Sequence, residues 1–196
     1  MRKVNFSKKD DYHTQINNIV IPLASCTPTS TIMAGKTEGC LFDYPKFMQP
    51  EDYFTILLRS DYGIDLRNSL TPWFKKDDVP PNEIHLVVSQ MFNDLVGRKV
   101  TTFDENGNLD KLIKELRERH PVVVSGGFTG RGHTLCVVGY IEDDSGVVTD
   151  VIVDDPYGNY HKKYRDHRGN DISFPVNDFD RLWHGFMHIY RKDGFS

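Results

Sequence analysis

Residues 132–140 read Gly-His-Thr-Leu-Cys-Val-Val-Gly-Tyr, and this stretch decides the fold that we expect for the chain. It is apolar, rich in valine and bounded by glycine, which predicts a strand that begins at His133. Similar strands are predicted at 121–125 and 147–153, with turns rich in Gly or Asp between them. Together with a last strand at 186–191, they indicate an antiparallel sheet.

The sequence before this sheet is typical of helices. After Cys26, a proline in the first turn and a run of small residues predict a helix that begins at the cysteine and ends near Gly35. Apolar residues at helical spacing predict three further helices, at 53–59, 84–96 and 109–119. One short strand is expected among them, at 99–103, and a capped helix follows the sheet strands at 177–183.

The order of these elements, helices first and sheet afterwards, favours the α+β class. We expect one domain over residues 1–196, because this length holds one core rather than two. Within it, a helical half at about 12–120 packs on a sheet half at about 121–192. A cleft between the two halves is the expected place for a functional site.

Composition narrows the functional classes. The chain has 38% hydrophobic and 27% charged residues and a net charge of −4, which is typical of a globular protein and gives no basic field for nucleic acid. No stretch reaches the ~18 consecutive apolar residues of a membrane helix, and the amino terminus lacks an apolar signal segment. We therefore expect a protein made in the cytoplasm, either kept there, released or carried in a virion, with no nucleic-acid or membrane partner. Nothing in the sequence predicts its oligomeric state.

Three cysteines, Cys26, Cys40 and Cys136, cannot all pair, so each thiol is considered alone. A thiol attacks as its thiolate, and an ordinary cysteine with a pKa near ~8.5 needs help to lose its proton. Only Cys26 stands at a predicted helix start, where backbone N–H groups and the helix dipole favour an anion. We predict that Cys26 is a nucleophile and that Cys40 and Cys136 are core residues.

A base for this thiol is expected among the eight histidines. His133 follows a glycine at the mouth of an apolar strand, where its ring can project into the cleft as a general base. Asp155 closes the neighbouring strand and can orient that ring. Asp154 is the alternative, although strand alternation turns it to the opposite face.

These segments resemble the papain-clan cysteine peptidases, and within them the leader peptidases of bacteriocin exporters (double-glycine peptidases) and their stand-alone bacterial and phage relatives. The likeness lies in Cys26-Thr-Pro-Thr-Ser, in Gly132-His-Thr-Leu-Cys-Val-Val-Gly-Tyr and in Asp155-Pro-Tyr-Gly. The family pairs a Cys-Gly-Pro-Thr-Ser-like motif with the other two segments in the same order. Thr27 departs from this pattern, because it stands where the family usually has glycine, and it is expected to narrow the pocket beside the thiol.

The resemblance implies a papain-like fold and a cysteine hydrolase that cleaves peptide or amide bonds without a cofactor or metal. It also implies that Gln15 lends its amide to an oxyanion hole, with the N–H of Cys26 as second donor and with Asn17 or Asn18 as alternatives to Gln15. Peptidoglycan peptides are the substrate expected for a bacterial or phage lytic or effector enzyme. Two other functions stay open: an idle fold used as a binding or structural phage module, and acyl transfer by the same triad.

A metal site is the remaining alternative. His184 and His188 stand four residues apart, a spacing that would bring two imidazoles together on a helix. Gly185 and the alternation of aromatic residues favour a strand there instead, so no metal is expected.

Overall fold

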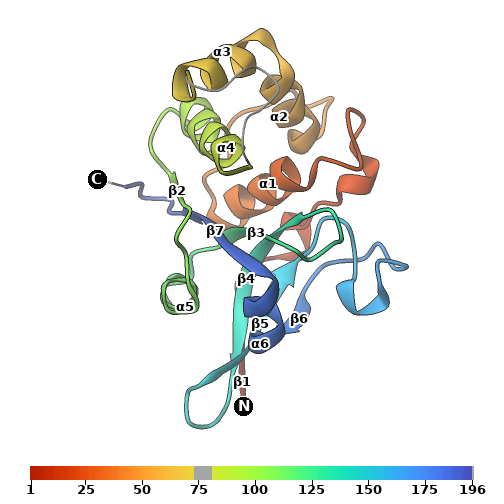
Figure 1. Ribbon diagram of the computed structural model, residues 1–196, viewed down its shortest axis with the longest axis vertical. Helices are drawn as coiled ribbons and strands as arrows, with labels where there is room; N and C mark the ends of the chain where they lie inside the picture. Colours follow the sequence, from red (N-terminus) through yellow and green to blue (C-terminus); the bar gives the residue numbers. More distant parts are fainter. Residues whose placement is uncertain (73–80, 196) are drawn as a thin grey trace.

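The protein is described here from a computed structural model, which covers residues 1–72 and 81–195 and is drawn in Figure 1. Within these residues the chain forms one seven-stranded sheet and six α-helices, and every strand pairing is antiparallel. The structure thereby confirms the α+β class. The strands run in the order β2-β7-β3-β4-β5-β6, and β1 pairs with β4 outside this path.

Five of the seven strands lie close to the predicted positions. Their bounds are β1 Arg2–Asn5, β2 Thr101–Asp104, β3 Val122–Gly126, β4 His133–Glu142, β5 Val148–Asp154, β6 Ile172–Pro175 and β7 Trp183–Tyr190. The strand predicted from residues 132–140 is β4, and it begins at His133 as expected. It lies at the centre of the sheet, between β3 and β5, so its side chains are buried on both faces.

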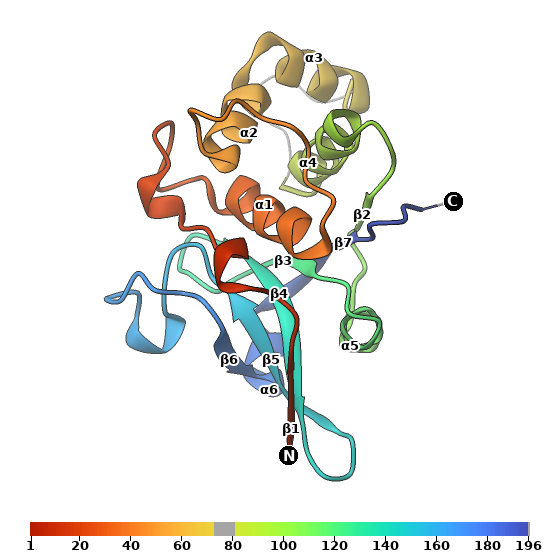
Figure 2. The ribbon, with the colours of Figure 1, turned by 180° about the vertical axis from the view of Figure 1, so that it is seen from behind.

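The helices fall into two groups on opposite faces of the sheet (Figures 1 and 2). The first group is α1 Cys26–Glu38, α2 Pro50–Arg59, α3 Asp61–Leu70 and α4 Pro81–Val96. In this group α1 packs directly on β4 and α4 packs on β2, while α2 and α3 lie farther from the sheet. The second group is α5 Leu109–Arg117 and α6 Val176–Leu182, which pack on the other face.

Strand alternation divides the core in two. Val123 and Cys136 are fully buried on the face that α1 covers, whereas Val124 and Leu135 are fully buried on the face that α5 and α6 cover. The prediction that Cys136 is a core residue is confirmed, and Cys40 is also buried, with 4% of its surface exposed. The two apolar layers hold the sheet rigidly between the helix groups, because close-packed cores yield little to local strain.

The predicted end of the first helix near Gly35 is wrong, because α1 continues to Glu38. A Cβ on Gly35 would lie 2.6 Å from the Cζ atom of Phe92, so this glycine lets α4 approach α1 rather than ending the helix. The helix ends at Gly39, whose φ of 72° is the left-handed conformation that favours glycine.

Three elements have no counterpart in the predictions: β1, α3 and β6. In addition, the predicted helical half at 12–120 includes β2 and α5, and both pack with the sheet half in the structure. Asp104 in β2 pairs with Met187 of β7, although the two lie far apart in the sequence. The spacing of apolar residues indicates which face of a helix or strand is buried, but it does not indicate which other element packs on that face.

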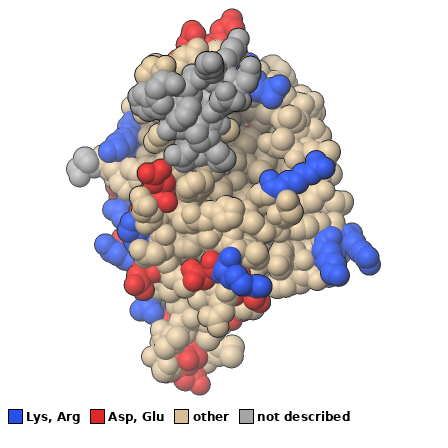
Figure 3. Space-filling model, viewed as in Figure 1, with Lys and Arg blue, Asp and Glu red and all other residues tan. Residues whose placement is uncertain are grey.

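The surface shows dispersed charge. Figure 3 shows Lys, Arg, Asp and Glu side chains scattered over one face, with broad uncharged areas between them. In the described part of the chain, no helix combines the length and the apolar character that a membrane span requires.

Candidate active site

The position of Cys26 follows from the packing of α1 on β4. Cys26 is the first residue of α1 and is partly exposed, so its thiol lies at the positive end of the helix dipole and stays within reach of a ligand. One turn further on, the hydroxyl of Ser30 donates a 3.1 Å hydrogen bond to the carbonyl of Thr134. This bond fixes the start of α1 against the start of β4, which carries His133.

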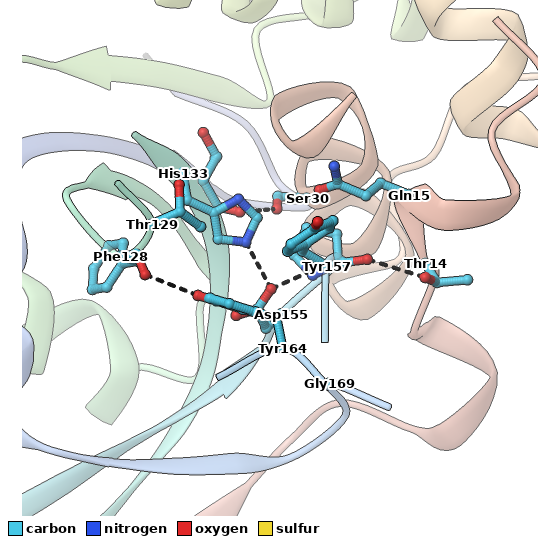
Figure 4. A network of polar contacts seen from close by, with 12 residues as sticks. Thr14, Gln15, Ser30, Phe128, Thr129, His133, Asp155, Tyr157, Tyr164 and Gly169 are labelled. Atoms are coloured by element: carbon cyan, nitrogen blue, oxygen red, sulfur yellow. Dashed lines mark hydrogen bonds and ion pairs between the residues drawn. The ribbon is translucent and has the colours of Figure 1, made fainter. Parts of the chain in front are cut away.

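His133 and Asp155 are in direct contact. The Nε2 atom of His133 lies 2.7 Å from Oδ1 of Asp155, and both side chains are almost completely buried (Figure 4). A carboxylate accepts, so Nε2 carries the proton, and Nδ1 is the ring nitrogen that remains for an interaction with the thiol of Cys26. The structure therefore brings together the three residues that the sequence singled out.

The carboxylate of Asp155 is held by the loop that follows β5. Its Oδ1 also accepts a 2.9 Å hydrogen bond from the N–H of Tyr157, and the N–H of Asp155 donates to the carbonyl of Gly169. A Cβ on Gly169 would lie 2.0 Å from the carbonyl oxygen of Asp155, so only glycine permits this approach. The alternative, Asp154, points away and accepts hydrogen bonds from Asn170 and Asp171.

Gln15 is anchored to the same loop. Its backbone N–H donates a 2.9 Å hydrogen bond to the carbonyl of Pro156, which also accepts from the hydroxyl of Thr14. The side-chain Nε2 donates to the carbonyl of Pro22 at 2.8 Å, and the second N–H of that amide remains for a ligand. The alternatives lie elsewhere: Asn17 bonds to Gln49, and Asn18 bonds to the loop N–H groups of Val20 and Ile21.

A cavity of about 250 Å³ joins these groups, between the start of α1 and the loop before β4. Gln15, Cys26 and His133 all contribute to its lining, as do Leu23, Tyr157 and the four residues from Thr129 to Gly132. Thr27 does not line it. Its hydroxyl lies 2.9 Å from that of Thr134, so this side chain is turned away from the cavity that it was expected to narrow.

The electrostatics of the site favour an ion pair. Burial alone would raise the pKa of the Cys26 thiol, but hydrogen bonding and the charge of His133, with hydrogen bonds from Thr134, hold it below its ordinary value. Burial works against the charged form of His133 as well. Its hydrogen bonds to Asp155 and Cys26, and their charges, nevertheless raise its pKa to about 9. Thiolate and imidazolium stabilise each other here.

A chain of hydroxyl groups lies beneath the thiol. The hydroxyl of Thr134 is within hydrogen-bond distance of Thr27, at 2.9 Å, and of Ser125, at 2.8 Å, and hydrogen bonding by Thr134 lowers the pKa of the Cys26 thiol. If Thr134 donates to the sulfur, its oxygen accepts from both neighbours, and every hydroxyl in the chain is satisfied. Such a chain polarises each O–H toward the thiolate.

Replacement of Thr134 by valine removes this donor while keeping the shape of the side chain. We expect the pKa of the Cys26 thiol in Thr134→Val to rise by about one unit, because hydrogen bonds to the anion stabilise it. The measurement is the rate of alkylation by iodoacetamide at Cys26 as a function of pH. Thr149→Val, on the exposed side of β5, is the matched control; equal thiol pKa values in the two folded variants would contradict a role for Thr134.

Two tyrosines enclose His133: Tyr157, which belongs to the Asp155-Pro-Tyr-Gly motif, and Tyr164, which the sequence did not single out. The rings of Tyr157 and Tyr164 lie edge-on to the imidazole, at centroid distances of 6.1 and 6.0 Å. The hydroxyl of Tyr164 donates to the carbonyl of Phe128, and its backbone has a left-handed φ of 59° (Figure 4). These rings shield the hydrogen bond between His133 and Asp155 from water, which strengthens it.

The histidines considered for metal binding lie outside this site. His188 is fully buried, and its Nε2 lies 2.8 Å from Nδ1 of His85, while His184 is exposed on the same strand. Among the described residues, Glu115, Glu118 and His120 are near enough to hold a cation together. However, Arg191 donates two hydrogen bonds to Glu115, so a guanidinium already neutralises that carboxylate.

Comparison with known proteins agrees with this architecture. A family model described as the Peptidase_C39 like family matches residues 8–186. A crystal structure of a C39-like peptidase from Bacillus anthracis is similar over 100% of both chains, with a TM-score of 0.62 and 16% sequence identity. At that identity, the likeness shows a shared fold. No curated protein matches the sequence.

Proposed function

The chain belongs to the C39-like peptidase family, and from this premise we propose that it is a cysteine peptidase that uses Cys26, His133 and Asp155 as its triad. The observation that carries the proposal is the 2.7 Å contact between His133 and Asp155 beside a cavity that Cys26 also lines. A lowered thiol pKa together with a raised imidazole pKa supports the same assignment.

The proposed reaction begins when the sulfur of Cys26 attacks the carbonyl carbon of the amide and the carbonyl electrons move to oxygen. As the C–N bond breaks, the imidazolium of His133 gives its proton to the leaving amine, and a thioester remains. His133 then takes a proton from water, whose oxygen attacks the thioester, and the C–S bond breaks. The net reaction consumes one water, and the ion pair is restored.

Gln15 is assigned to the oxyanion hole, with the N–H of Cys26 as the second donor. We expect Gln15→Ala to lower kcat by about 10²-fold to 10³-fold with little change in KM, because the donor acts on charge that develops in the transition state. Steady-state kinetics on a peptide substrate measure this split. Asn17→Ala, from the same 3-10 helix, is the control, and an equal loss of kcat in both variants would reject the assignment.

For the substrate, we propose the peptide part of peptidoglycan, on the resemblance to stand-alone bacterial and phage hydrolases. The corresponding role is that of a lytic or effector enzyme. A cell-wall zymogram tests it directly. Clearing of the cell-wall gel by the wild type and not by Cys26→Ala would support the proposal. Cleavage of soluble peptides without any clearing would indicate that the substrate is a protein instead.

Two alternative functions use the same fold. In acyl transfer, an amine instead of water would take the acyl group from Cys26, and mass spectrometry of the products would find a new amide instead of a free acid. In an idle binding module, the thiol would titrate like a free cysteine. Thr27 is the residue that favours an idle module, because it departs from the family pattern beside the thiol; its hydroxyl lies 2.9 Å from that of Thr134, and it does not line the cavity of Cys26.

A further inference from the structure

A second cavity lies on the other side of the start of α1. It has a volume of about 340 Å³ and is walled by α1, α2, α3 and α4, which Figure 2 shows grouped on one side of the sheet. Thr27 lines it, one residue from the nucleophile, and so do Ile21 and Ala24. Leu23 lines the cavity of Cys26 instead. Neighbouring residues of the segment 21–27 therefore line the two cavities, Ile21, Ala24 and Thr27 the second cavity and Leu23 and Cys26 the first.

The walls of this second cavity are mostly apolar, with Leu58, Ile64, Ile84, Val87 and Val88 among them. Two hydroxyl groups at its lining are already engaged. Thr27 bonds to Thr134, and Thr55 donates to the carbonyl of Glu51 at 2.6 Å. A ligand therefore meets hydrophobic surface, which favours an apolar group.

Two arginines give the cavity a positive charge. Arg59 is exposed, Arg67 is half-buried, and both line the cavity. Within the described residues, neither guanidinium has a hydrogen bond or ion pair to a carboxylate, and the Nε atom of Arg67 is buried without any partner. None of the described lining residues is acidic. A buried donor without a partner is costly, and a guanidinium matches a carboxylate in geometry and charge.

We propose that this cavity is a substrate-binding pocket that selects an apolar group carrying a carboxylate, next to the bond cleaved at Cys26. The apolar walls take the hydrocarbon part, and Arg67, with Arg59 nearer the solvent, binds the carboxylate. The carboxylate comes either from an acidic side chain or from the end of the peptide chain. This inference rests on the proposed function, because it places the pocket beside the nucleophile of a peptidase.

Binding to the Cys26→Ala protein tests the pocket without requiring turnover. The probes are hexapeptides of alanine and leucine in which one position is glutamate or glutamine and the carboxyl terminus is free or amidated. We expect one acidic peptide to bind at least tenfold more tightly than its neutral match, as measured by calorimetry, and the difference to shrink at high salt. Tighter binding of the glutamate peptide indicates that the pocket binds the carboxylate of a side chain. Tighter binding of the peptide with a free terminus indicates that it binds the carboxylate at the end of the chain.

Arg67→Met in the same background is expected to remove this preference, and Arg59→Met to weaken it, whereas Arg98→Met beyond α4 leaves it unchanged. Arg59 is exposed, so its variant still gives a reading if Arg67→Met fails to fold. Equal binding of acidic and neutral peptides, or no binding of either, would contradict the proposed pocket. An undiminished preference for the acidic peptide in the folded arginine variants would contradict it as well.

The active enzyme separates this inference from the proposed function. If the wild type cleaves acidic and neutral peptides with the same kcat/KM, the proposed carboxylate pocket is rejected, but the proposed peptidase activity is supported. If Cys26→Ala binds the acidic peptide more tightly but the wild type cleaves none of the peptides, the carboxylate pocket is supported and the proposed peptidase activity is rejected.

Discussion

Cys26→Ala is expected to lose at least about 10⁴-fold in kcat/KM, the largest effect of any single change. In the proposed reaction Cys26 supplies the electron pair that forms the thioester, so the rate that remains without it would reflect binding and the proposed oxyanion hole alone. The measurement is hydrolysis of a peptide substrate under conditions in which the wild type turns over many times. Iodoacetamide should abolish the activity of the wild type to the same extent.

Cys40→Ala is the matched control, because Cys40 is a small buried thiol outside the site. Burial raises the pKa of its thiol to about 12, so it stays protonated at neutral pH. This variant should keep both its activity and its sensitivity to iodoacetamide. Turnover that survives in Cys26→Ala would show that Cys26 is not the nucleophile.

His133→Ala is expected to lower kcat/KM by at least about 10³-fold. In the proposed reaction the imidazolium of His133 stabilises the thiolate before the attack and donates the proton to the leaving amine afterwards, so both functions would be lost together. His184→Ala, an exposed histidine on β7, is the control and should retain full activity. Equal rates for the two variants would exclude His133 as the base.

The pH profile of the wild type follows from the two shifted groups. In the proposed mechanism the active form holds a thiolate and an imidazolium, so activity should rise as pH increases through the pKa of Cys26, which lies below its ordinary value. It should fall again as His133, whose pKa is raised to about 9, loses its proton. In His133→Ala the thiol of Cys26 loses its charged partner, so we expect the pKa of Cys26 to rise. The increase of the alkylation rate with pH should then occur at higher pH than in the wild type.

The sequence predicted the parts of the site that are local. Cys26 at a helix start, His133 at a strand start and Asp155 at a strand end each have a signature within a few residues, because capping, glycine and strand alternation act over that range. The same reasoning separated Asp155 from Asp154. The approach of Cys26, His133 and Asp155 to one another depends on the pairing of β4 with β5 and on the packing of α1 on β4, and the sequence supported it only through the order of the three motifs.

Several elements escaped prediction for physical reasons. The strand β1 carries charged and polar residues, and it is a strand because it pairs with β4, far away in the sequence. In α3, the glycine at position 63 is typical of a turn, yet it lies within a helix that the hydroxyl of Ser60 caps. Glycine is needed there because a Cβ at Gly63 would lie 2.5 Å from the carbonyl oxygen of Leu57. Long-range pairing and close backbone approach leave no periodic signal.

The residues that surround Cys26, His133 and Asp155 were also beyond sequence reasoning. Thr134 acts on the thiol only because α1 brings Cys26 onto β4, and Tyr164 encloses His133 through a left-handed turn that aromatic residues rarely adopt. The arginines of the second cavity lie on α2 and α3, more than thirty positions from the nucleophile. Their relation to Cys26 exists only in the folded chain.

The most direct test of the account is the pKa of the Cys26 thiol itself. Alkylation by iodoacetamide across a pH series, followed by mass spectrometry of the peptide that contains Cys26, reports this value without any assumption about substrate. We predict a pKa below the ~8.5 of a free cysteine, lowered by His133 and Thr134. A Cys26 pKa at or above that of a free cysteine in the folded wild type would contradict the thiolate–imidazolium pair on which the proposed chemistry depends.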